Sequence, residues 1–353
     1  MGAVTIIYQI FMVGRTIGSS LFLFKQWSND LGAVEKALLL FKQGGDDFFV
    51  AKKRSKQSLK RTKSIPETSK HIKELITSNN ATYVRFLLDR IKNRSYDGGT
   101  IVVERYRLVL FTQGKVASTV FKQLARRMME LEDWMVDNRQ VPHNPATNGL
   151  SYLKYYKTAD ALTILTSSRW TRAIFVRDPK ERILSAFLDK AARNGGEYIT
   201  NNCCQTFSLP SNSNRSYMCG DHAHGSFLGF LEVVQSECCC DGHWMPQSSR
   251  IDWPFRPYIT FVGHFDRIQE DTKQLLHLLS IRSGEADLWA RFGASGWGSN
   301  SSAIFSESTK ANHKTSARAN LSKYYNSTVD ALVEELYYED YTDRLLNFTS
   351  LTS

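Results

Sequence analysis

Two strand-like runs of apolar residues are each followed by a pattern of helical spacing. The run IVVERYRLVLF, residues 101–111, is rich in β-formers, and VFKQLARRMMELEDWM, residues 120–135, has apolar positions at helical spacing. TRAIFV at 171–176 is the second strand-like run, and ERILSAFLDKAAR at 181–193 is the second helical one. Strand, polar turn and helix in this order predict an α/β fold with parallel strands. Ligands then bind beyond the carboxyl ends of the strands, where both turns lie.

The segments on either side of these two units have different patterns of apolar and polar residues. Residues 1–24 are apolar and long enough to span a bilayer, but Arg15 lies in their middle and the basic residues follow rather than precede them. Two interpretations stay open for 1–24, a signal anchor or an N-terminal helix packed in the protein. Residues 25–99 are expected to form a stem or linker, and 100–349 the main folded domain. Residues 317–346 are expected to be helical.

Composition narrows the class of partner. The chain has 353 residues, of which 42% are hydrophobic and 23% charged, as in globular proteins. Its net charge of +10 favours an anionic partner: nucleic acid, acidic glycan, phosphorylated cofactor or anionic membrane. The run AKKRSKQSLKRTK at 51–63 is typical of a solvated linker, and the alternative is nuclear import or nucleic-acid contact.

Cysteines and glycosylation sequons both indicate an oxidising, lumenal environment. All 6 cysteines lie within 203–240, and none form the paired C-x-x-C spacing of a zinc site, so local disulfides are expected in this insert. Seven asparagines begin N-x-S/T sequons, which exceeds chance expectation: Asn80, Asn93, Asn214, Asn300, Asn320, Asn326 and Asn347.

The first turn, TQGKVASTVF at 112–121, resembles a phosphate-binding loop. A glycine lets the backbone approach an anion, a lysine supplies a mobile positive charge, and hydroxyls at a helix start face an anion that the helix dipole favours. Gly114, Lys115, Ser118 and Thr119 would fill these roles. The alternative is structural, with Ser118 an ordinary N-cap and Lys115 exposed to solvent.

The second turn, FVRDPKERILSAFLDK at 175–190, follows the second strand. Arg177 stands at the end of a buried strand, where an unpaired arginine is costly. Asp178 and Pro179 form a rigid helix start, and Ser185 follows on the helix, so that Arg177 and Ser185 can bind a second phosphate. In the structural alternative, Arg177 pairs with Asp178 or Glu181.

These two stretches, GKVASTVF and AIFVRDPKERILSAFLDK, closely resemble the two phosphosulfate-binding motifs of the Golgi carbohydrate sulfotransferases of the chondroitin, dermatan and HNK-1 type. Three further stretches are similar to that family in the same order: DGHWMPQ at 241–247, YITFVGHFDRIQEDTKQLL at 258–276, and HKTSARANLSKYYNSTVDALVEELYYEDY at 313–341. The resemblance covers roughly residues 100–348. The stretch SSRIDW lacks a cysteine that the family commonly has there.

The resemblance implies a P-loop-like sulfotransferase fold and a sulfuryl donor, 3′-phosphoadenylyl sulfate (PAPS), without a metal. Lys115, Ser118 and Thr119 would hold the 5′-phosphosulfate, and Arg177 and Ser185 the 3′-phosphate. The predicted cofactor-binding residues are Gly114, Lys115, Val116, Ala117, Ser118, Thr119, Arg177 and Ser185. Lys115 would also be catalytic, because negative charge builds on the leaving oxygen.

A general base must take the proton of the acceptor hydroxyl, and histidine suits neutral pH. His143, which lies between the two turns where related glycan sulfotransferases keep a histidine, is the predicted base. His243 and Trp244 are predicted to bind the acceptor, with Trp244 stacking on a sugar ring or lying in the core. Other candidates for the base are His243 itself and the side chains of His222, His224, Glu197 and Asp241.

The function expected from the resemblance is transfer of a sulfuryl group from PAPS to a carbohydrate hydroxyl in the Golgi lumen, on a membrane-anchored protein. The acceptor is expected to be an anionic glycan, and no nucleic-acid partner is expected. Two alternatives remain. A P-loop kinase or NTPase would need a hydroxyl directly after Lys115, where the chain has Val116. A non-catalytic basic protein would bind glycan or nucleic acid through 51–63.

Overall fold

The computed structural model describes residues 81–93, 99–135, 142–204, 213–236, 241–306 and 315–348. All of these ranges lie in one compact unit, Ser64–Ser353. The predictions made for 1–24 and for the basic run at 51–63 fall outside the described residues. Within the described part of the chain, no helix combines the length and apolar character needed to cross a bilayer.

In the described ranges, four strands form one mixed sheet in the order β1–β2–β3–β4. The strands are β1 (Ile101–Val103), β2 (Leu108–Phe111), β3 (Thr171–Val176) and β4 (Phe261–His264). β3 runs parallel to both β2 and β4, whereas β1 is antiparallel to β2. The prediction of an α/β fold with parallel strands is therefore confirmed.

The run 101–111 forms two strands rather than one. A 3₁₀ turn, Glu104–Tyr106, interrupts it, and Arg107 follows in the left-handed region with φ 49°. This left-handed residue reverses the chain, so that Ile101 pairs with Leu110 across the hairpin. A non-glycine residue rarely takes this conformation, and the sequence therefore gives no warning of the turn.

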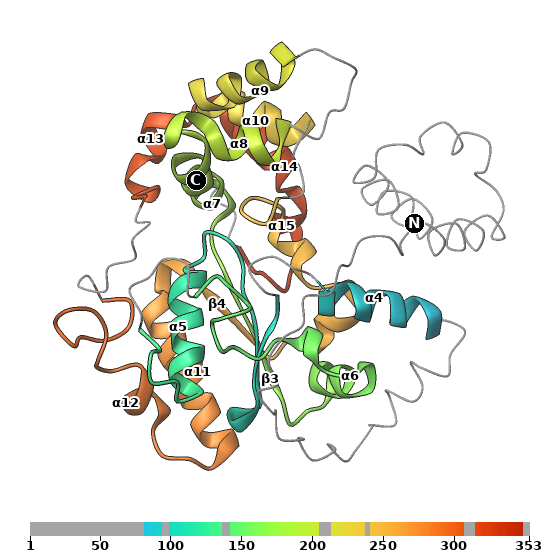
Figure 1. Ribbon diagram of the computed structural model, residues 1–353, viewed down its shortest axis with the longest axis vertical. Coiled ribbons are helices and arrows are strands. Elements are labelled where there is room, and N and C mark those ends of the chain that lie inside the picture. Colours follow the sequence, from blue (N-terminus) through green and yellow to red (C-terminus); the bar gives the residue numbers. More distant parts are fainter. Residues whose placement is uncertain are drawn as a thin grey trace. The chain divides into compact units, whose positions relative to one another are not determined.

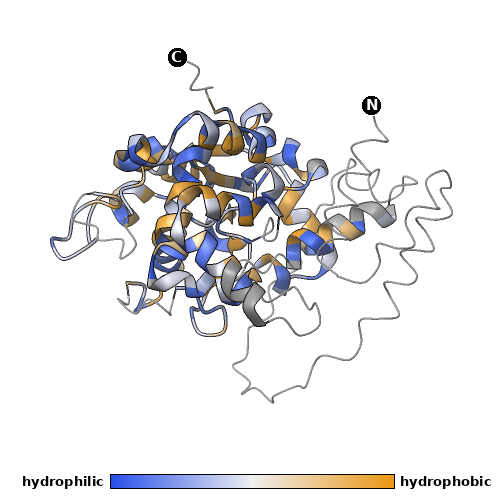
Figure 2. Cartoon of the chain, turned by 90° about the horizontal axis from the view of Figure 1, so that it is seen from above, coloured by the Kyte–Doolittle hydropathy of each residue, from blue (hydrophilic) through white to orange (hydrophobic). Residues whose placement is uncertain are grey.

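Alternate strand residues enter two different cores, because successive side chains of a strand point to opposite faces. Leu110, Ala173 and Phe175 pack with α5 (Ser118–Met128), α11 (Ile268–Ser283) and α12 (Leu288–Phe292). Val109, Ile174 and Val176 pack with α4 (Ala81–Asn93) and α6 (Thr158–Thr166). Helices thus cover both faces of the sheet (Figure 1). Figure 2 shows helices that are hydrophobic along one side and hydrophilic along the other.

A third core lies within a cluster of helices beyond the carboxyl ends of β2 and β3 (Figure 1). Its helices are α7 (Pro179–Ala186), α8 (Glu197–Asn202), α9 (Ser213–Gly225), α10 (Phe227–Ser236), α13 (Leu321–Tyr324) and α14 (Ser327–Leu336), and α15 (Tyr338–Thr342) follows. The helix predicted over 317–346 is thus broken into short pieces. The break before α14 is at Asn326, which has an extended backbone. Its side chain caps α14 by accepting a hydrogen bond from the Val329 N–H.

The two helices that follow the turns also differ from their predicted lengths. α5 ends at Met128 instead of continuing to residue 135, because Glu130 takes a left-handed conformation with φ 59°. α7 begins at Pro179, as predicted, and passes into a π-helical segment, Phe187–Ala191. Such segments are rare and frequently occur at functional sites.

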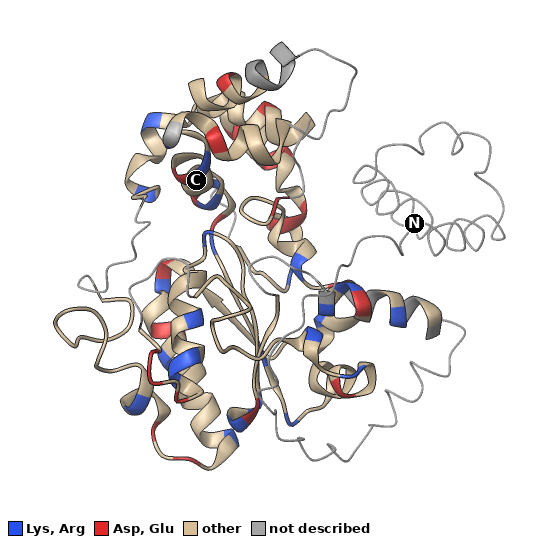
Figure 3. Cartoon of the chain, viewed as in Figure 1, with Lys and Arg blue, Asp and Glu red and all other residues tan. Residues whose placement is uncertain are grey.

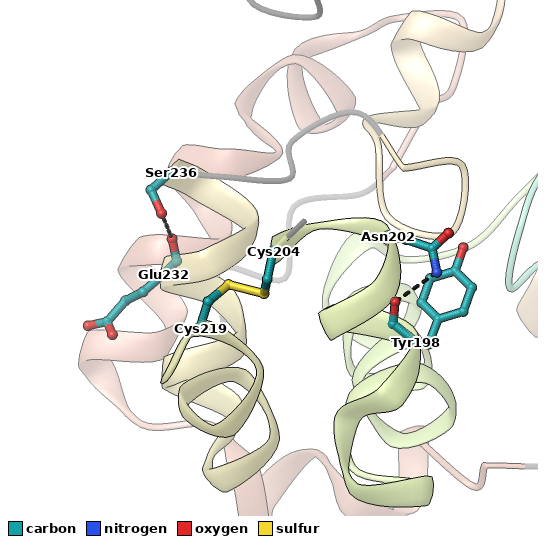
Figure 4. The surroundings of a disulfide bond; sticks show 6 residues. All are labelled: Tyr198, Asn202, Cys204, Cys219, Glu232 and Ser236. Carbon is teal, nitrogen blue, oxygen red and sulfur yellow. Dashed lines mark hydrogen bonds between the residues drawn. A yellow bond between two sulfur atoms is a disulfide. The ribbon is translucent and has the colours of Figure 1, made fainter. Parts of the chain in front are cut away.

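A disulfide between Cys204 and Cys219 connects the end of α8 to α9 (Figure 4). Cys203 is disulfide-bonded as well. The expectation of local disulfides in the insert is therefore confirmed for these three cysteines. Cys238, Cys239 and Cys240 lie outside the described residues.

Candidate functional site

The first turn connects β2 to α5, and its bend is made by residues other than glycine. Lys115 and Ala117 both have left-handed backbones, with φ 64° and 54°, whereas Gly114 is not among the described residues with positive φ. The left-handed residues of this turn are therefore Lys115 and Ala117, and the close approach of an anion to Gly114 stays a prediction. Two non-glycine residues held in this region represent strain, which is typical of functional sites.

The amino-terminal end of α5 is arranged to bind an anion. Ala117 is its N-cap residue, and among the described residues no side chain caps the first turn. Ser118 is therefore the first helical residue and not an N-cap, which removes the structural alternative for its hydroxyl. The first N–H groups of a helix have no partner within the helix, and together with the helix dipole they favour an anion there.

His143 lies beside this helix end. Its Nε2 shares a hydrogen bond of 2.9 Å with the Thr119 hydroxyl, and its Nδ1 lies 3.5 Å from Lys122 Nζ. The side chain is partly buried. The predicted base therefore contacts a residue of the predicted phosphosulfate loop, although 24 positions separate them in the sequence.

The second turn follows β3 directly. Asp178 accepts a hydrogen bond of 3.0 Å from the Glu181 N–H and caps α7, whose first residue is Pro179. Arg177 is 7% exposed; its Nε lies 3.4 Å from Glu181 Oε2, and its guanidinium lies 4.2 Å from the centre of the Phe265 ring. The ion pair between Arg177 and Glu181, which the structural alternative predicts, is thus present. A contact of 3.4 Å is long for a charge-assisted hydrogen bond, and it does not prevent Arg177 from binding an anion.

Buried arginines connect the two turns. Arg177 donates to the Lys115 carbonyl at 3.2 Å, and Arg182 donates to the Gly114 carbonyl at 3.0 Å. In addition, the Gln113 side chain donates to the Phe175 carbonyl at 3.0 Å. The two predicted turns therefore form one unit at the carboxyl edge of the sheet.

The third stretch, 241–247, packs against the same unit. Arg182 also donates to the Met245 carbonyl at 2.8 Å, and Gln247 hydrogen-bonds the backbone of Arg177. Trp244 is 1% exposed and packs edge-on against Phe230. Its indole therefore belongs to the core, which is the second of the two roles considered for it, and this placement does not favour stacking on a sugar.

His243 is held by Asp241 and Tyr198. Its Nδ1 lies 2.7 Å from Asp241 Oδ1, and the Tyr198 hydroxyl donates to Asp241 Oδ2 at 2.8 Å. Because an ionised carboxylate only accepts hydrogen bonds, Nδ1 carries the proton. Burial lowers the pKa of His243 and outweighs Asp241, and the charges of Lys190 and Lys115 lower it further.

The contact with His243 also shifts the pKa of Asp241. Burial acts to raise the pKa of Asp241, but the hydrogen bond and charge of His243 outweigh burial and hold it below its ordinary value. At neutral pH the pair is therefore a carboxylate beside a neutral imidazole. This is the form in which a histidine accepts a proton or a substrate hydrogen bond.

Several neighbours of the predicted residues carried no signal in the sequence. Asp189 forms an ion pair of 2.9 Å with Lys115. The Ser185 hydroxyl lies 2.9 Å from that of Thr315, and Arg318 Nε lies 3.5 Å from Glu181 Oε1. These contacts join positions 74 to 137 residues apart, so no local pattern could have found them.

The remaining candidates for the base lie elsewhere in the helical cluster. His222 forms an exposed pair with Glu232 at 2.5 Å, His224 hydrogen-bonds the Ala191 carbonyl, and Glu197 is exposed in the first turn of α8. Within the ranges that the structure describes, no group of three or more His, Cys, Asp or Glu side chains is arranged to hold a metal ion.

Comparisons with known proteins agree with this geometry. Residues 99–347 match the sulfotransferase family. Carbohydrate sulfotransferase 12 of Mus musculus is 25% identical over 224 residues, which cover 54% of this chain and 52% of that protein. The same enzyme of Xenopus laevis is 25% identical over 219 residues, covering 55% and 51%. Carbohydrate sulfotransferase 8 of Homo sapiens is 27% identical over 182 residues, covering 50% and 42%.

The match spans about half the length of the first two of these relatives. No solved structure matches the chain at a significant level.

Proposed function

Because this chain belongs to the sulfotransferase family, we propose that it transfers a sulfuryl group from PAPS to a hydroxyl group of a carbohydrate. The observation that carries the proposal is the joining of the two turns at the carboxyl edge of the sheet, with Arg177 donating to the Lys115 carbonyl. Two cationic side chains and an uncapped helix start then lie in one unit. The names of the similar proteins support a carbohydrate acceptor.

The residues of the two turns fit a donor with two separate anionic groups. Lys115, Ser118 and Thr119 would hold the 5′-phosphosulfate at the start of α5, together with the N–H groups of that helix. Arg177 and Ser185 would hold the 3′-phosphate. Gly114, Val116 and Ala117 would contribute the backbone of the cradle.

PAPS supplies the sulfuryl group for an in-line displacement and leaves as 3′,5′-ADP. The Lys115 ammonium would offset the negative charge that develops on the leaving oxygen. His143, beside Thr119, would take the proton from the acceptor hydroxyl. The neutral imidazole of His243 would orient the acceptor through a hydrogen bond. None of these steps requires a metal ion.

We also propose that the protein acts in the Golgi lumen on an anionic glycan, and that residues 1–24 anchor it to the membrane. The disulfide and the seven sequons support an oxidising, lumenal compartment. Lys and Arg are interspersed with Asp and Glu over the described helices (Figure 3). Seven of the basic residues lie in the run 51–63, which contains no acidic residue and therefore accounts for most of the +10.

The alternative of a kinase or NTPase conflicts with the first turn. Such enzymes place a Ser or Thr hydroxyl directly after the lysine to bind Mg²⁺. Here that position is Val116, which is 2% exposed and belongs to the hydrophobic core beside α5. The second alternative, binding through 51–63, assigns no role to the two joined turns.

Calorimetric binding of 3′,5′-ADP to the full chain tests the donor site, with 5′-AMP and ATP as competing nucleotides. We expect the 3′-phosphorylated nucleotide to bind most tightly, and Lys115→Ala and Arg177→Ala each to weaken binding at least about tenfold, the loss of one charge-assisted contact. Arg85→Ala, exposed on α4, is the matched control. If the folded protein prefers ATP or ignores all three nucleotides, the proposed function is wrong.

Transfer of ³⁵S-sulfate from labelled PAPS to a panel of desulfated glycosaminoglycans tests the chemistry. His143→Ala should abolish transfer while leaving 3′,5′-ADP affinity within about twofold, because a general base acts on the acceptor and not on the donor. Full transfer by this variant would exclude His143 as the base, and His243→Ala would then be the next variant to measure.

A further inference from the structure

We infer that Asp189 is a positioning residue for this reaction, which holds the ammonium group of Lys115 in place at the donor site as a cation. The inference rests on the proposed function, because it concerns the lysine that would face the phosphosulfate. It adds a residue that was not among the predicted site residues.

The contact is direct and buried. Lys115 Nζ lies 2.9 Å from Asp189 Oδ2, and the two side chains are 8% and 7% exposed. A buried ion pair with this geometry fixes a long, flexible side chain that would otherwise occupy several rotamers. An ammonium group has three N–H donors, so the bond to Asp189 is compatible with a second acceptor such as a sulfate or phosphate oxygen.

Asp189 owes its place to the helix that carries the second turn. It lies in the π-helical segment Phe187–Ala191, four residues after Ser185, within a segment closed by the bond from the Ala192 N–H to the Phe187 carbonyl. Residues four apart on a helix face the same side, and the wider π turn adjusts the direction of the later side chain. The helix that presents Ser185 therefore also presents Asp189 to the first turn.

Without Asp189 the surroundings of Lys115 would shift further toward favouring the neutral amine. Burial lowers the pKa of Lys115 and outweighs Asp189, which raises it, and the charges of Lys190 and Arg177 lower it further. A neutral amine would neither attract the phosphosulfate nor offset charge on the leaving oxygen. The role of Asp189 is therefore distinct from that of a residue that only fills space.

Several charged and titratable groups lie around the pair in the described part of the chain. Lys190 Nζ and Arg193 Nη1 lie 3.5 Å and 3.6 Å from the Asp189 carboxylate. His243 interacts electrostatically with both Lys115 and Lys190. Tyr198 interacts electrostatically with both Asp189 and Asp241, so a second carboxylate lies in this neighbourhood. Asp189 is the carboxylate that contacts Lys115 directly, and its removal should shift the titration of Lys115 toward lower pH.

The test compares Asp189→Asn, which keeps the shape of the side chain and removes its charge, with the wild type. Calorimetry would follow 3′,5′-ADP affinity of the full chain from pH 7 to 10.5. The alkaline midpoint, at which affinity falls as Lys115 loses its proton, should move down by at least about one pH unit. Asp221→Asn, exposed on α9, is the matched control and should leave the midpoint unchanged.

A second measurement keeps the inference testable without the nucleotide. Competitive labelling with acetic anhydride, read by peptide mass spectrometry, reports the protonation of Lys115 directly. We expect wild-type Lys115 to be protonated at pH 7 and to become reactive at lower pH in Asp189→Asn.

The outcomes separate the two proposals. If the wild type binds no 3′,5′-ADP but labelling shows the shift, the proposed function fails and the electrostatic role of Asp189 survives. If the folded Asp189→Asn variant shows the wild-type midpoint and labelling profile, the inference is overturned, even if its melting temperature falls. If Asp189→Asn does not fold, labelling of the wild type decides. A Lys115 that is already deprotonated at pH 7 would then overturn the inference.

Discussion

The side chain of Gln247 pairs with the backbone of Arg177 on both sides. Its Nε2 donates to the Arg177 carbonyl at 2.7 Å, and its Oε1 accepts from the Arg177 N–H at 2.9 Å. Gln247 is 1% exposed, and its own N–H donates to Asp340 at 2.9 Å. The amide thus continues the hydrogen bonding of β3 one residue beyond the end of the strand, where Arg177 would meet the 3′-phosphate.

Replacement of Gln247 by leucine should therefore weaken both stability and the donor site. Two buried backbone groups of Arg177 lose their partners, which should cost about 2–4 kcal/mol in the free energy of unfolding. Urea unfolding measures this loss, and calorimetry with 3′,5′-ADP measures the effect on the site. Gln235→Leu, an exposed position on α10, is the control. A Gln247→Leu variant that is as stable as this control would contradict the prediction.

Local sequence signals were sufficient where a structural feature depends on neighbouring residues. The strand TRAIFV is β3 from its first residue to its last, because six consecutive buried positions suit a central parallel strand. The start of α7 was also predictable, since an Asp-Pro pair caps a helix and fixes its first residue. The placement of Arg177 followed from these boundaries.

Features that depend on distant contacts were not predictable. Nothing near Arg107 or Ala117 marks a left-handed backbone, because neither is glycine. The partners of the predicted site residues, Asp189 for Lys115 and Thr315 for Ser185, are brought together only by the packing of α7 over the first turn and of the segment before α13 against α7. Sequence reasoning therefore located the two turns but not the residues that support them.

Arg182 offers a separate test of how the turns are joined. This arginine is 1% exposed and donates to carbonyls of Gly114, Met245 and Gly242, at 3.0, 2.8 and 3.4 Å. Lysine keeps the charge but lacks the planar group that reaches several acceptors. Arg182→Lys should lower the free energy of unfolding by about 2–4 kcal/mol, as expected when buried acceptors lose their donors. Arg85→Lys, exposed on α4, is the control, and equal stability of both variants in urea would contradict the proposed joining role.

Stability should fall on the acid side partly because of His243. Burial lowers the pKa of His243 in the folded protein, so the unfolded chain binds a proton at higher pH than the folded one. The contribution of this histidine is therefore complete above about pH 6.5 and is lost as the pH falls through the lower folded pKa.

His243→Gln should reduce the fall of the free energy of unfolding with falling pH. Burial also lowers the pKa of His264, which should account for a further part of that fall. The measurement is the free energy of unfolding in urea at several values between pH 7.5 and 5. Slopes are compared rather than absolute values, because the substitution also removes contacts to Asp241. Gln235→Leu, exposed on α10 and without a titratable group, should keep the wild-type slope. An unchanged slope in His243→Gln would show that this histidine titrates alike in both states.

The Cys204–Cys219 disulfide should stabilise the helical cluster without contributing to donor binding. It closes a loop with a sequence separation of 15, for which the chain-entropy model gives about 3 kcal/mol. The double variant Cys204→Ser, Cys219→Ser leaves no unpaired cysteine at either position, and it should unfold at a lower temperature by a corresponding amount.

A reducing agent is a poorer test, because Cys203 is disulfide-bonded too and would be reduced at the same time. Below its melting temperature the double variant should bind 3′,5′-ADP within about twofold of the wild type, because the bond joins α8 to α9 and not the two turns. Loss of nucleotide binding by a folded double variant would instead show that the insert supports the donor site.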